Sequence, residues 1–277
     1  MALLHVSFYS PALRRTVPCD VILPTDKCLP GQPGYVRARP FRTLYLLHGI
    51  FGSCHDWVCG TRMMALAQQH DLCVVMPSGD NKFYADSDIS GDRYGDFIVK
   101  DLVSFTESSF AVSRLREDRF IGGLSMGAFG AVTNALRHPE LFSRVLMFSP
   151  ALLKDQVLNS TPDGNGDFFT DRQYCTLFGI ERPADFDGCE SDYEMLACRA
   201  QWYAPKPEIW MSCGRSDGFY QRSLSYRDLL LSLGYSVSWN EWDGGHTWDF
   251  WDESFTRMLP WLQTGNGTEG ISSGNVM

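Results

Sequence analysis

The sequence lacks several features that would assign it to a particular class of protein. It has no run of about 18 consecutive apolar residues, the length that a membrane helix needs. Its 24 Lys and Arg are outnumbered by 33 Asp and Glu, so the chain is a poor counter-ion for a phosphate backbone. Residues 1–10 have neither a basic flank nor a small-residue cleavage site and are typical of a first β-strand. We therefore expect no nucleic-acid partner, no membrane partner and no export signal.

The cysteines also lack a pattern. There are nine, and none forms a Cys-x-x-Cys pair, which argues against a zinc ribbon or a dithiol redox motif. Cys73 and Cys213 lie in apolar stretches, where a thiol behaves as a small hydrophobic side chain. So many thiols without an export signal predict a location in the reducing cytoplasm. The sequons at Asn159 and Asn266 are then expected to be chance matches.

Short apolar strands alternate with helical stretches along most of the chain. For example, the apolar segment 72–76 is typical of a buried strand, whereas residues 94–110 have the 3.6-residue apolar repeat of a helix. This alternation predicts a mostly parallel sheet that is covered by helices on both faces. Further strands are expected at 14–23, 41–47, 119–123, 145–149, 208–213 and 235–242, and further helices at 61–70, 126–138, 220–233 and 248–262.

Two segments depart from this alternation. Residues 151–205 are rich in Asp, Gly and aromatic residues, and we expect them to form a cap-like insertion over the carboxyl edge of the sheet, after the sixth strand. Residues 264–277 have little to bury and are predicted to be a disordered tail. The remainder, residues 1–263 with the insertion, is predicted to be a single α/β domain.

The most informative motif is Gly123-Leu-Ser-Met-Gly127, a G-x-S-x-G match. An apolar strand precedes it and a helix follows at once, which is the context of a nucleophile elbow. Such a turn forces the serine into a strained backbone conformation, and the two glycines remove side chains that would collide across it. Ser125 is therefore the predicted nucleophile.

A serine hydroxyl needs a general base, and the base needs an orienting acid. His246 is the only histidine after residue 138, and it lies in a glycine-flanked loop between the last strand and the last helix. Asp217 follows the penultimate strand, so its carboxylate can reach that loop. In hydrolases of this type the three residues occur in the order Ser, Asp, His. The rivals for the acid are Asp187, Asp192, Asp243 and Asp249.

The oxyanion formed on attack needs preorganised backbone N–H groups. One should come from Met126, the residue after the nucleophile. The other should come from the loop after the strand that ends in His48-Gly49, where Ile50 is the best candidate and Phe51 the alternative. His48 itself is predicted to orient this loop.

These stretches resemble a known family. The segments 46–52 (LLHGIFG), 123–127 (GLSMG), 214–217 (GRSD) and 244–248 (GGHTW) are similar to those of the esterase D group of α/β-hydrolases. That group includes tributyrin esterases, S-formylglutathione hydrolases, feruloyl esterase domains and mycolyltransferases. The resemblance covers residues 5–262 and implies an α/β-hydrolase fold, with Asp217 and His246 as acid and base and with Ile50 and Met126 as oxyanion donors.

Function is predicted from these residues and this resemblance together. The first hypothesis is a serine carboxylic ester hydrolase that acts on short-chain acyl or aryl esters through an acyl-enzyme. Alternatives within the family are a feruloyl, cinnamoyl or acetyl esterase acting on plant-carbohydrate esters, an S-formylglutathione hydrolase and an acyltransferase. A catalytically silent binding module is a further alternative. The partner is a small-molecule ester, and a homo-oligomer is left open.

The rings of the insertion and of neighbouring loops predict a short, closed acyl pocket at the carboxyl edge of the sheet. We expect Phe51, Trp57, Tyr94 and Trp202 to contact the substrate. No His-x-x-x-His or clustered His and Asp set is visible, so we expect no metal and no cofactor.

Overall fold

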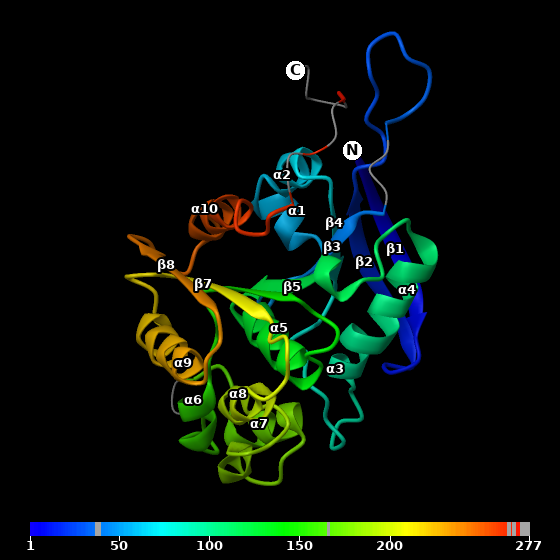
Figure 1. Ribbon diagram of the computed structural model, residues 1–277. Coiled ribbons are helices and arrows are strands. Elements are labelled where there is room, and N and C mark those ends of the chain that lie inside the picture. Colours follow the sequence, from blue (N-terminus) through cyan, green and yellow to red (C-terminus); the bar gives the residue numbers. More distant parts are fainter. Residues whose placement is uncertain (37–39, 165–166, 265–266, 268–269, 272–277) are drawn as a thin grey trace.

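The computed structural model describes residues 1–36, 40–164, 167–264, 267 and 270–271. One eight-stranded sheet runs through the molecule in the order β1-β2-β4-β3-β5-β6-β7-β8 (Figure 1). β1 pairs antiparallel with β2, β2 pairs antiparallel with β4, and the other neighbours are parallel. The strands are β1 Ala2–Ser10, β2 Arg15–Leu23, β3 Arg42–Leu47, β4 Leu72–Pro77, β5 Arg119–Leu124, β6 Arg144–Phe148, β7 Glu208–Gly214 and β8 Val237–Trp242.

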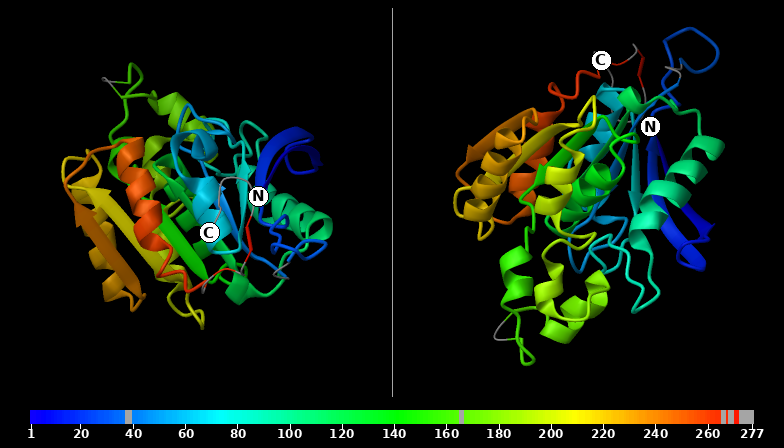
Figure 2. Two further views of the ribbon diagram at one scale, coloured as in Figure 1. Left: turned by 90° about the horizontal axis from the view of Figure 1, so that it is seen from above. Right: turned by 60° about the horizontal axis from the view of Figure 1, so that its bottom comes forward.

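Helices cover both faces of this sheet (Figures 1 and 2). One face carries α1 Asp56–Gly60, α2 Met63–Gln69 and α10 Trp248–Met258. The other carries α3 Tyr94–Asp96, the π-helix η1 Phe97–Leu102, α4 Val103–Ser109, α5 Met126–Arg137 and α9 Tyr220–Ser232. A short 3-10 helix, η2 Arg116–Asp118, precedes β5. The predicted α/β architecture is confirmed.

The core has two layers because successive side chains of a strand point to opposite faces. In β3, Leu44 and Leu46 belong to the layer beneath α1, α2 and α10, whereas Tyr45 and Leu47 belong to the layer beneath α5. Both layers are apolar, which explains why the central strands are near-continuous hydrophobic runs. No helix within the described residues is both long enough and apolar enough to cross a bilayer.

The predicted insertion follows β6 and is helical. It contains α6 Lys154–Leu158, α7 Asp171–Phe178, the 3-10 helix η3 Pro183–Phe186 and α8 Tyr193–Ala200 (Figure 2, right). Rings anchor it to the body: Phe129 of α5 contacts Phe178 and Tyr193, with ring centroids 5.7 and 6.0 Å apart. Tyr226 of α9 adds a hydrogen bond from its hydroxyl to the Tyr193 carbonyl (3.1 Å).

Most of the predicted disordered tail lies outside the described residues. Three described residues in that range form hydrogen bonds with the body of the protein. Thr264 Oγ1 is 3.0 Å from Nδ1 of His70. Gly267 N–H donates to the Gln69 carbonyl (3.0 Å), and Ile271 exchanges two backbone hydrogen bonds with Cys28 (2.8 and 2.9 Å).

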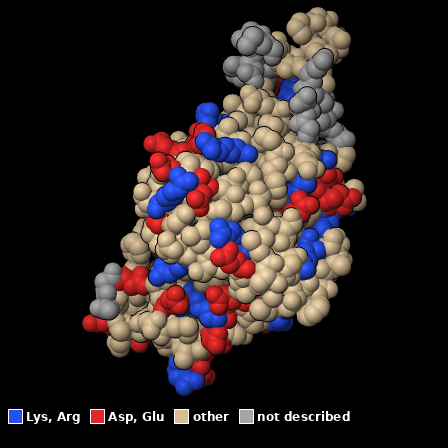
Figure 3. Space-filling view, turned by 60° about the vertical axis from the view of Figure 1, so that its left-hand side comes forward, with Lys and Arg blue, Asp and Glu red and all other residues tan. Residues whose placement is uncertain are grey.

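Charged side chains form small mixed groups on the side of the molecule made by β8, α9 and α10 (Figure 3). The ion pairs of these elements include Arg215 with Glu241, Arg227 with Asp228 and Arg257 with Glu253. On this face, therefore, basic residues are balanced locally by acidic ones.

The burial of Trp57 gives a stability prediction. Its ring is fully buried against Phe148 and Trp248, so Trp57→Ala should lower the free energy of unfolding by about 3–5 kcal/mol through the cavity it leaves. Trp202 is 85% exposed, and Trp202→Ala should stay within about 0.5 kcal/mol of the parent. Denaturant unfolding of both variants measures the difference, and equal losses would contradict the assigned core.

Candidate active site

Ser125 lies in the sharp turn between β5 and α5. Its φ and ψ are 53° and −118°, a conformation that costs energy for a residue with a Cβ and that persists only where its surroundings enforce it. Two backbone hydrogen bonds hold the turn: Ser125 N–H donates to the Phe148 carbonyl (2.9 Å), and Ala151 N–H donates to the Ser125 carbonyl (3.1 Å). The strained turn predicted from the G-x-S-x-G motif is present.

The glycines on either side of Ser125 are required by close backbone contacts. A Cβ on Gly127 would lie 2.3 Å from the Leu47 carbonyl oxygen, and one on Gly123 would lie 2.5 Å from the Gly127 carbonyl carbon. Backbone cannot give way as a flexible side chain can, so any side chain at either position would push β3 and the elbow apart. A Cβ on Gly130 would lie 2.5 Å from the Tyr84 ring. Glycine at this position therefore leaves room for the side chain of Tyr84, which belongs to the loop after β4.

His246 and Asp217 meet beside this turn. His246 lies in the loop between β8 and α10, and its Nδ1 is 2.9 Å from Oδ2 of Asp217, which follows β7. The other carboxylate oxygen accepts the Phe219 N–H at 2.9 Å. Burial raises the pKa of Asp217, but the hydrogen bonds from His246 and Phe219 outweigh it and leave the pKa below its ordinary value. The carboxylate is therefore ionised at neutral pH and fixes the orientation of the imidazole.

Two aromatic rings also hold the His246 imidazole in this orientation. Trp251 of α10 contacts the His246 ring edge-on at 4.9 Å between centroids, and Phe219 lies against it at 5.4 Å. With Nδ1 directed at Asp217, the geometry leaves Nε2 as the nitrogen that can exchange a proton with a third group.

The rival carboxylates have other partners. Asp243 is 95% exposed at its side chain and pairs with Arg215 (3.1 Å). Asp192 caps the N-terminus of α8, and both it and Asp187 bind the Lys154 ammonium (2.9 and 2.7 Å). Asp249 lies exposed in the first turn of α10. Among these acids, the one with a hydrogen bond to His246 is Asp217.

The loop after β3 holds Ile50 and Phe51, the two candidates for the second oxyanion donor. Phe51 N–H donates to Oδ1 of Asn81 (2.7 Å), so that amide is already engaged, which favours Ile50 over Phe51. His48 fixes the loop, because its Nδ1 is 2.6 Å from the Gly49 carbonyl and its Nε2 accepts the Gly79 N–H at 2.9 Å. Burial lowers the pKa of His48, so the ring is neutral and can donate from one nitrogen while it accepts at the other.

One cavity of about 320 Å³ brings the predicted residues together. Ser125, His246, Ile50, Met126 and Phe51 all line it, and Ser125 is 5% exposed. The remaining lining residues come mostly from the insertion and are largely apolar: Phe83, Ala151, Leu153, Gln156, Asp167, Phe168, Phe169, Tyr174 and Phe219.

Three predicted substrate contacts are corrected by the structure. Trp57 is buried in the core and donates its indole N–H to the Leu47 carbonyl (3.1 Å), so it cannot reach a substrate. Tyr94 is also buried, and its hydroxyl hydrogen-bonds to Asp80 and Arg15. Trp202 lies at a different hollow, together with Arg137 and Arg199. These three positions were inferred from residue type and loop location, which do not reveal the direction of a side chain.

Other functional residues were not predicted from the sequence. Asn81, which holds the Phe51 amide, and the polar pocket residues Gln156 and Asp167 belong to loops and an insertion without a recognisable motif. The sequence shows no clustered His and Asp set, yet the structure brings His5, Asp20 and His55 together. Their spacing of 15 and 35 residues gives no sequence signal, because the antiparallel register of β1 and β2 is what places His5 beside Asp20.

Comparisons with known proteins show the family of the chain. The family model Esterase, described as "Putative esterase", matches residues 10–262. An acetyl esterase of Caldicellulosiruptor saccharolyticus is 33% identical over 263 residues, which cover 95% of this chain and 98% of the relative.

Solved structures show the same fold. A fluorophosphonate-binding serine hydrolase of Staphylococcus aureus superposes with a TM-score of 0.81 at 24% identity, covering 96% of this chain and 99% of the other. An S-formylglutathione hydrolase of the same organism superposes with a TM-score of 0.79 at 25% identity, covering 94% and 98%. This chain therefore belongs to the Esterase family, has the α/β-hydrolase fold and is an ester hydrolase.

Proposed function

We propose that the protein hydrolyses short-chain acyl or aryl esters of small molecules through an acyl-enzyme on Ser125, with His246 as general base and Asp217 as the acid that orients it. The observation that carries this proposal is the convergence of a strained Ser125 and an Asp217-bound His246 on one cavity. The similarity to an acetyl esterase supports a short acyl group.

The proposed reaction has two halves. Ser125 Oγ attacks the ester carbon while His246 Nε2 takes the hydroxyl proton, and the N–H groups of Ile50 and Met126 stabilise the oxyanion. Collapse breaks the ester C–O bond, and the imidazolium returns the proton to the departing alcohol. Water then attacks the acyl-enzyme with the same proton relay, so the acid is released and Ser125 is restored. The ionised Asp217 stabilises the imidazolium in each half.

The lining of the cavity supports a limit on acyl length. Phe83, Phe169 and Tyr174 enclose an apolar space next to Ser125, but Gln156 and Asp167 add polar groups to its wall. Asp167 accepts hydrogen bonds from the Tyr174 hydroxyl (2.9 Å) and the Phe168 N–H (2.7 Å). A long acyl chain would desolvate these polar groups without replacing their contacts with water, which is unfavourable.

Two further statements belong to the proposal. All nine cysteines are free thiols, which favours the cytoplasm as the location. The body and its insertion are proposed to form one domain over residues 1–263, because the insertion is anchored to α5 and α9 by buried rings.

The nucleophile can be tested directly. Ser125→Ala should lower kcat/KM for a nitrophenyl ester by on the order of 10³-fold or more, because the covalent route is lost. The circular dichroism spectrum should not change, since alanine keeps the Cβ that the turn already holds. A fluorophosphonate probe should label the parent at Ser125 and leave Ser125→Ala unlabelled; labelling of another residue would refute the assignment.

The acid can be tested against a neighbouring carboxylate. Asp217→Asn should cause a large fall in kcat, because an amide can hold the imidazole in the wrong tautomer. Asp243→Asn removes a carboxylate of the loop that carries His246. This carboxylate is exposed and paired with Arg215, so kcat should be close to that of the parent. Steady-state kinetics of both variants provides the comparison, and a larger loss for Asp243→Asn would show that the acid is misassigned.

Acyl length can be tested with nitrophenyl esters of increasing chain length. Each methylene that fits contributes about 0.8 kcal/mol, whereas one that collides costs about 1–3 kcal/mol. The kcat/KM values should therefore be highest between acetyl and about butyryl or hexanoyl. Phe169→Ala should move this optimum to longer chains, and Trp202→Ala should not move it. An optimum at palmitoyl in the parent would exclude the proposed pocket.

A further inference from the structure

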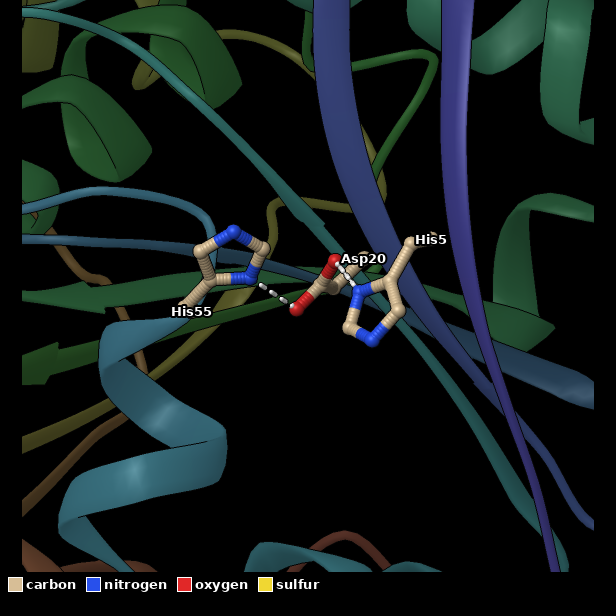
Figure 4. Close-up of side chains that lie close together, drawn as sticks. All are labelled: His5, Asp20 and His55. Atoms are coloured by element: carbon tan, nitrogen blue, oxygen red, sulfur yellow. Dashed lines mark hydrogen bonds and ion pairs between the residues drawn. The ribbon is translucent and has the colours of Figure 1, made fainter.

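A second cluster of chemically active side chains lies outside the catalytic cavity (Figure 4). His5 of β1 is the direct cross-strand partner of Asp20 in β2, and His55 immediately precedes α1. His5 Nδ1 is 2.7 Å from Oδ1 of Asp20, and His55 Nδ1 is 2.6 Å from Oδ2. The two imidazoles therefore approach one carboxylate from opposite sides, as Figure 4 shows.

The burial of the three side chains is uneven. Asp20 is 2% exposed, whereas the side chains of His5 and His55 are 65% and 55% exposed. A carboxylate buried to this degree needs compensation by a partner charge or a metal ion. The cluster lines an open hollow of about 580 Å³ whose other walls are Leu3, Val58 and Cys59. The two imidazoles therefore face solvent at this hollow, where an ion can approach them, and the carboxylate lies behind them.

We propose that His5, Asp20 and His55 bind one divalent transition-metal ion of the Zn²⁺ type through His5 Nδ1, His55 Nδ1 and a carboxylate oxygen. Imidazole nitrogen and carboxylate oxygen are ligands that Zn²⁺ accepts at about 2.0–2.2 Å, so two ligand atoms on one tetrahedral ion lie about 3.3–3.6 Å apart. The candidate atoms lie within 4.8 Å of one another. The exposed rings would have to rotate to bring them to the tetrahedral separation.

A metal ion bound at Nδ1 would use the lone pair of that nitrogen, so the proton of a neutral imidazole must sit on Nε2. A proton that starts on Nδ1 would pass to water while water supplies one to Nε2, with no net change in charge. Three protein ligands leave a fourth tetrahedral position for water.

The position of the site predicts a structural effect. The ion would connect β1, β2 and the segment that precedes α1. In the cluster itself, the side chains are joined by two hydrogen bonds to Asp20 and by an edge-on contact between the rings of His5 and His55 (5.4 Å between centroids). None of the three ligands is among the residues that line the catalytic cavity. Because the unfolded chain does not bring the ligands together, the ion should stabilise the folded protein.

The experiment uses the full chain after chelator treatment, titrated with ZnCl₂ by calorimetry and followed by thermal unfolding. The parent should bind one ion in a saturable step, and its Tm should rise with Zn²⁺ concentration. His5→Gln and His55→Gln should each lose that step and the rise in Tm. Both side chains are exposed, so these variants should still fold. Their circular dichroism spectra check this.

Three control variants and a chelator assay test whether binding is specific to this site. His138→Gln changes a histidine that pairs with Glu140 elsewhere and should bind as the parent does. Cys59→Ser should also retain the step, because the thiol is not among the proposed ligands. Ser125→Ala should bind Zn²⁺ normally, and a chelator should leave ester hydrolysis by the parent unchanged, so the result is independent of the proposed catalytic residues. Absence of a saturable step, or its persistence in both His5→Gln and His55→Gln, would overturn the site.

Discussion

The candidate active site depends on a close backbone contact between the end of β3 and the turn that carries Ser125. The Leu47 carbonyl oxygen lies where a Cβ of either Gly123 or Gly127 would have to be. This backbone contact brings the loop that begins at His48 next to the first turn of α5. As a result, the proposed oxyanion donors Ile50 and Met126, which are 76 positions apart in the chain, line the same cavity. A side chain at either glycine would separate them.

The contact at Leu47 positions the loop that begins at His48 only if that loop is itself rigid. The buried ring of His48 joins the Gly49 carbonyl to the Gly79 N–H, and the Tyr84 hydroxyl donates to the His48 carbonyl (3.1 Å). Protonation of His48 would turn its acceptor nitrogen into a donor and break the bond from Gly79. Burial lowers the pKa of His48, so the hydrogen bond from Gly79 is lost only at a lower pH than it would be with an exposed histidine. The network also links the loops after β3 and β4.

Two kinds of feature could be predicted from the sequence: helices and strands with a regular apolar repeat, and residues that directly follow a strand. The helix over Met126–Arg137 and the strand over Leu72–Pro77 were predicted to within about two residues of their ends, because apolar repeats and glycines mark them. Ser125, Asp217 and His246 each follow a strand whose carboxyl end lies at the same sheet edge, so their proximity could be inferred. Asp243 flanks His246 too closely in the chain for comfortable side-chain geometry, and in the structure it pairs with Arg215.

What could not be predicted depends on side-chain direction and on contacts between distant segments. Trp57 and Tyr94 are aromatic residues at that same edge, yet the fold turns both rings inward. Conversely, His5 looked like an unremarkable residue of a first strand. Its proximity to Asp20 follows from a strand register, and its proximity to His55 follows from the path of the chain into α1. Neither relation leaves a local pattern in the sequence.

The separation of the two histidine–aspartate groups has a physical basis. Asp217 and Asp20 are both buried carboxylates that bind an imidazole, but their surroundings differ. His246 is held by Trp251 and Phe219 at an apolar cavity that Ser125 also lines, which fits the proposed proton transfer between its second nitrogen and the serine hydroxyl. Asp20 is shared by two exposed rings at an open hollow, which fits the proposed binding of a small cation. The same pair of residue types is thus proposed to serve proton transfer in one place and ion binding in the other, according to the surroundings of the imidazole.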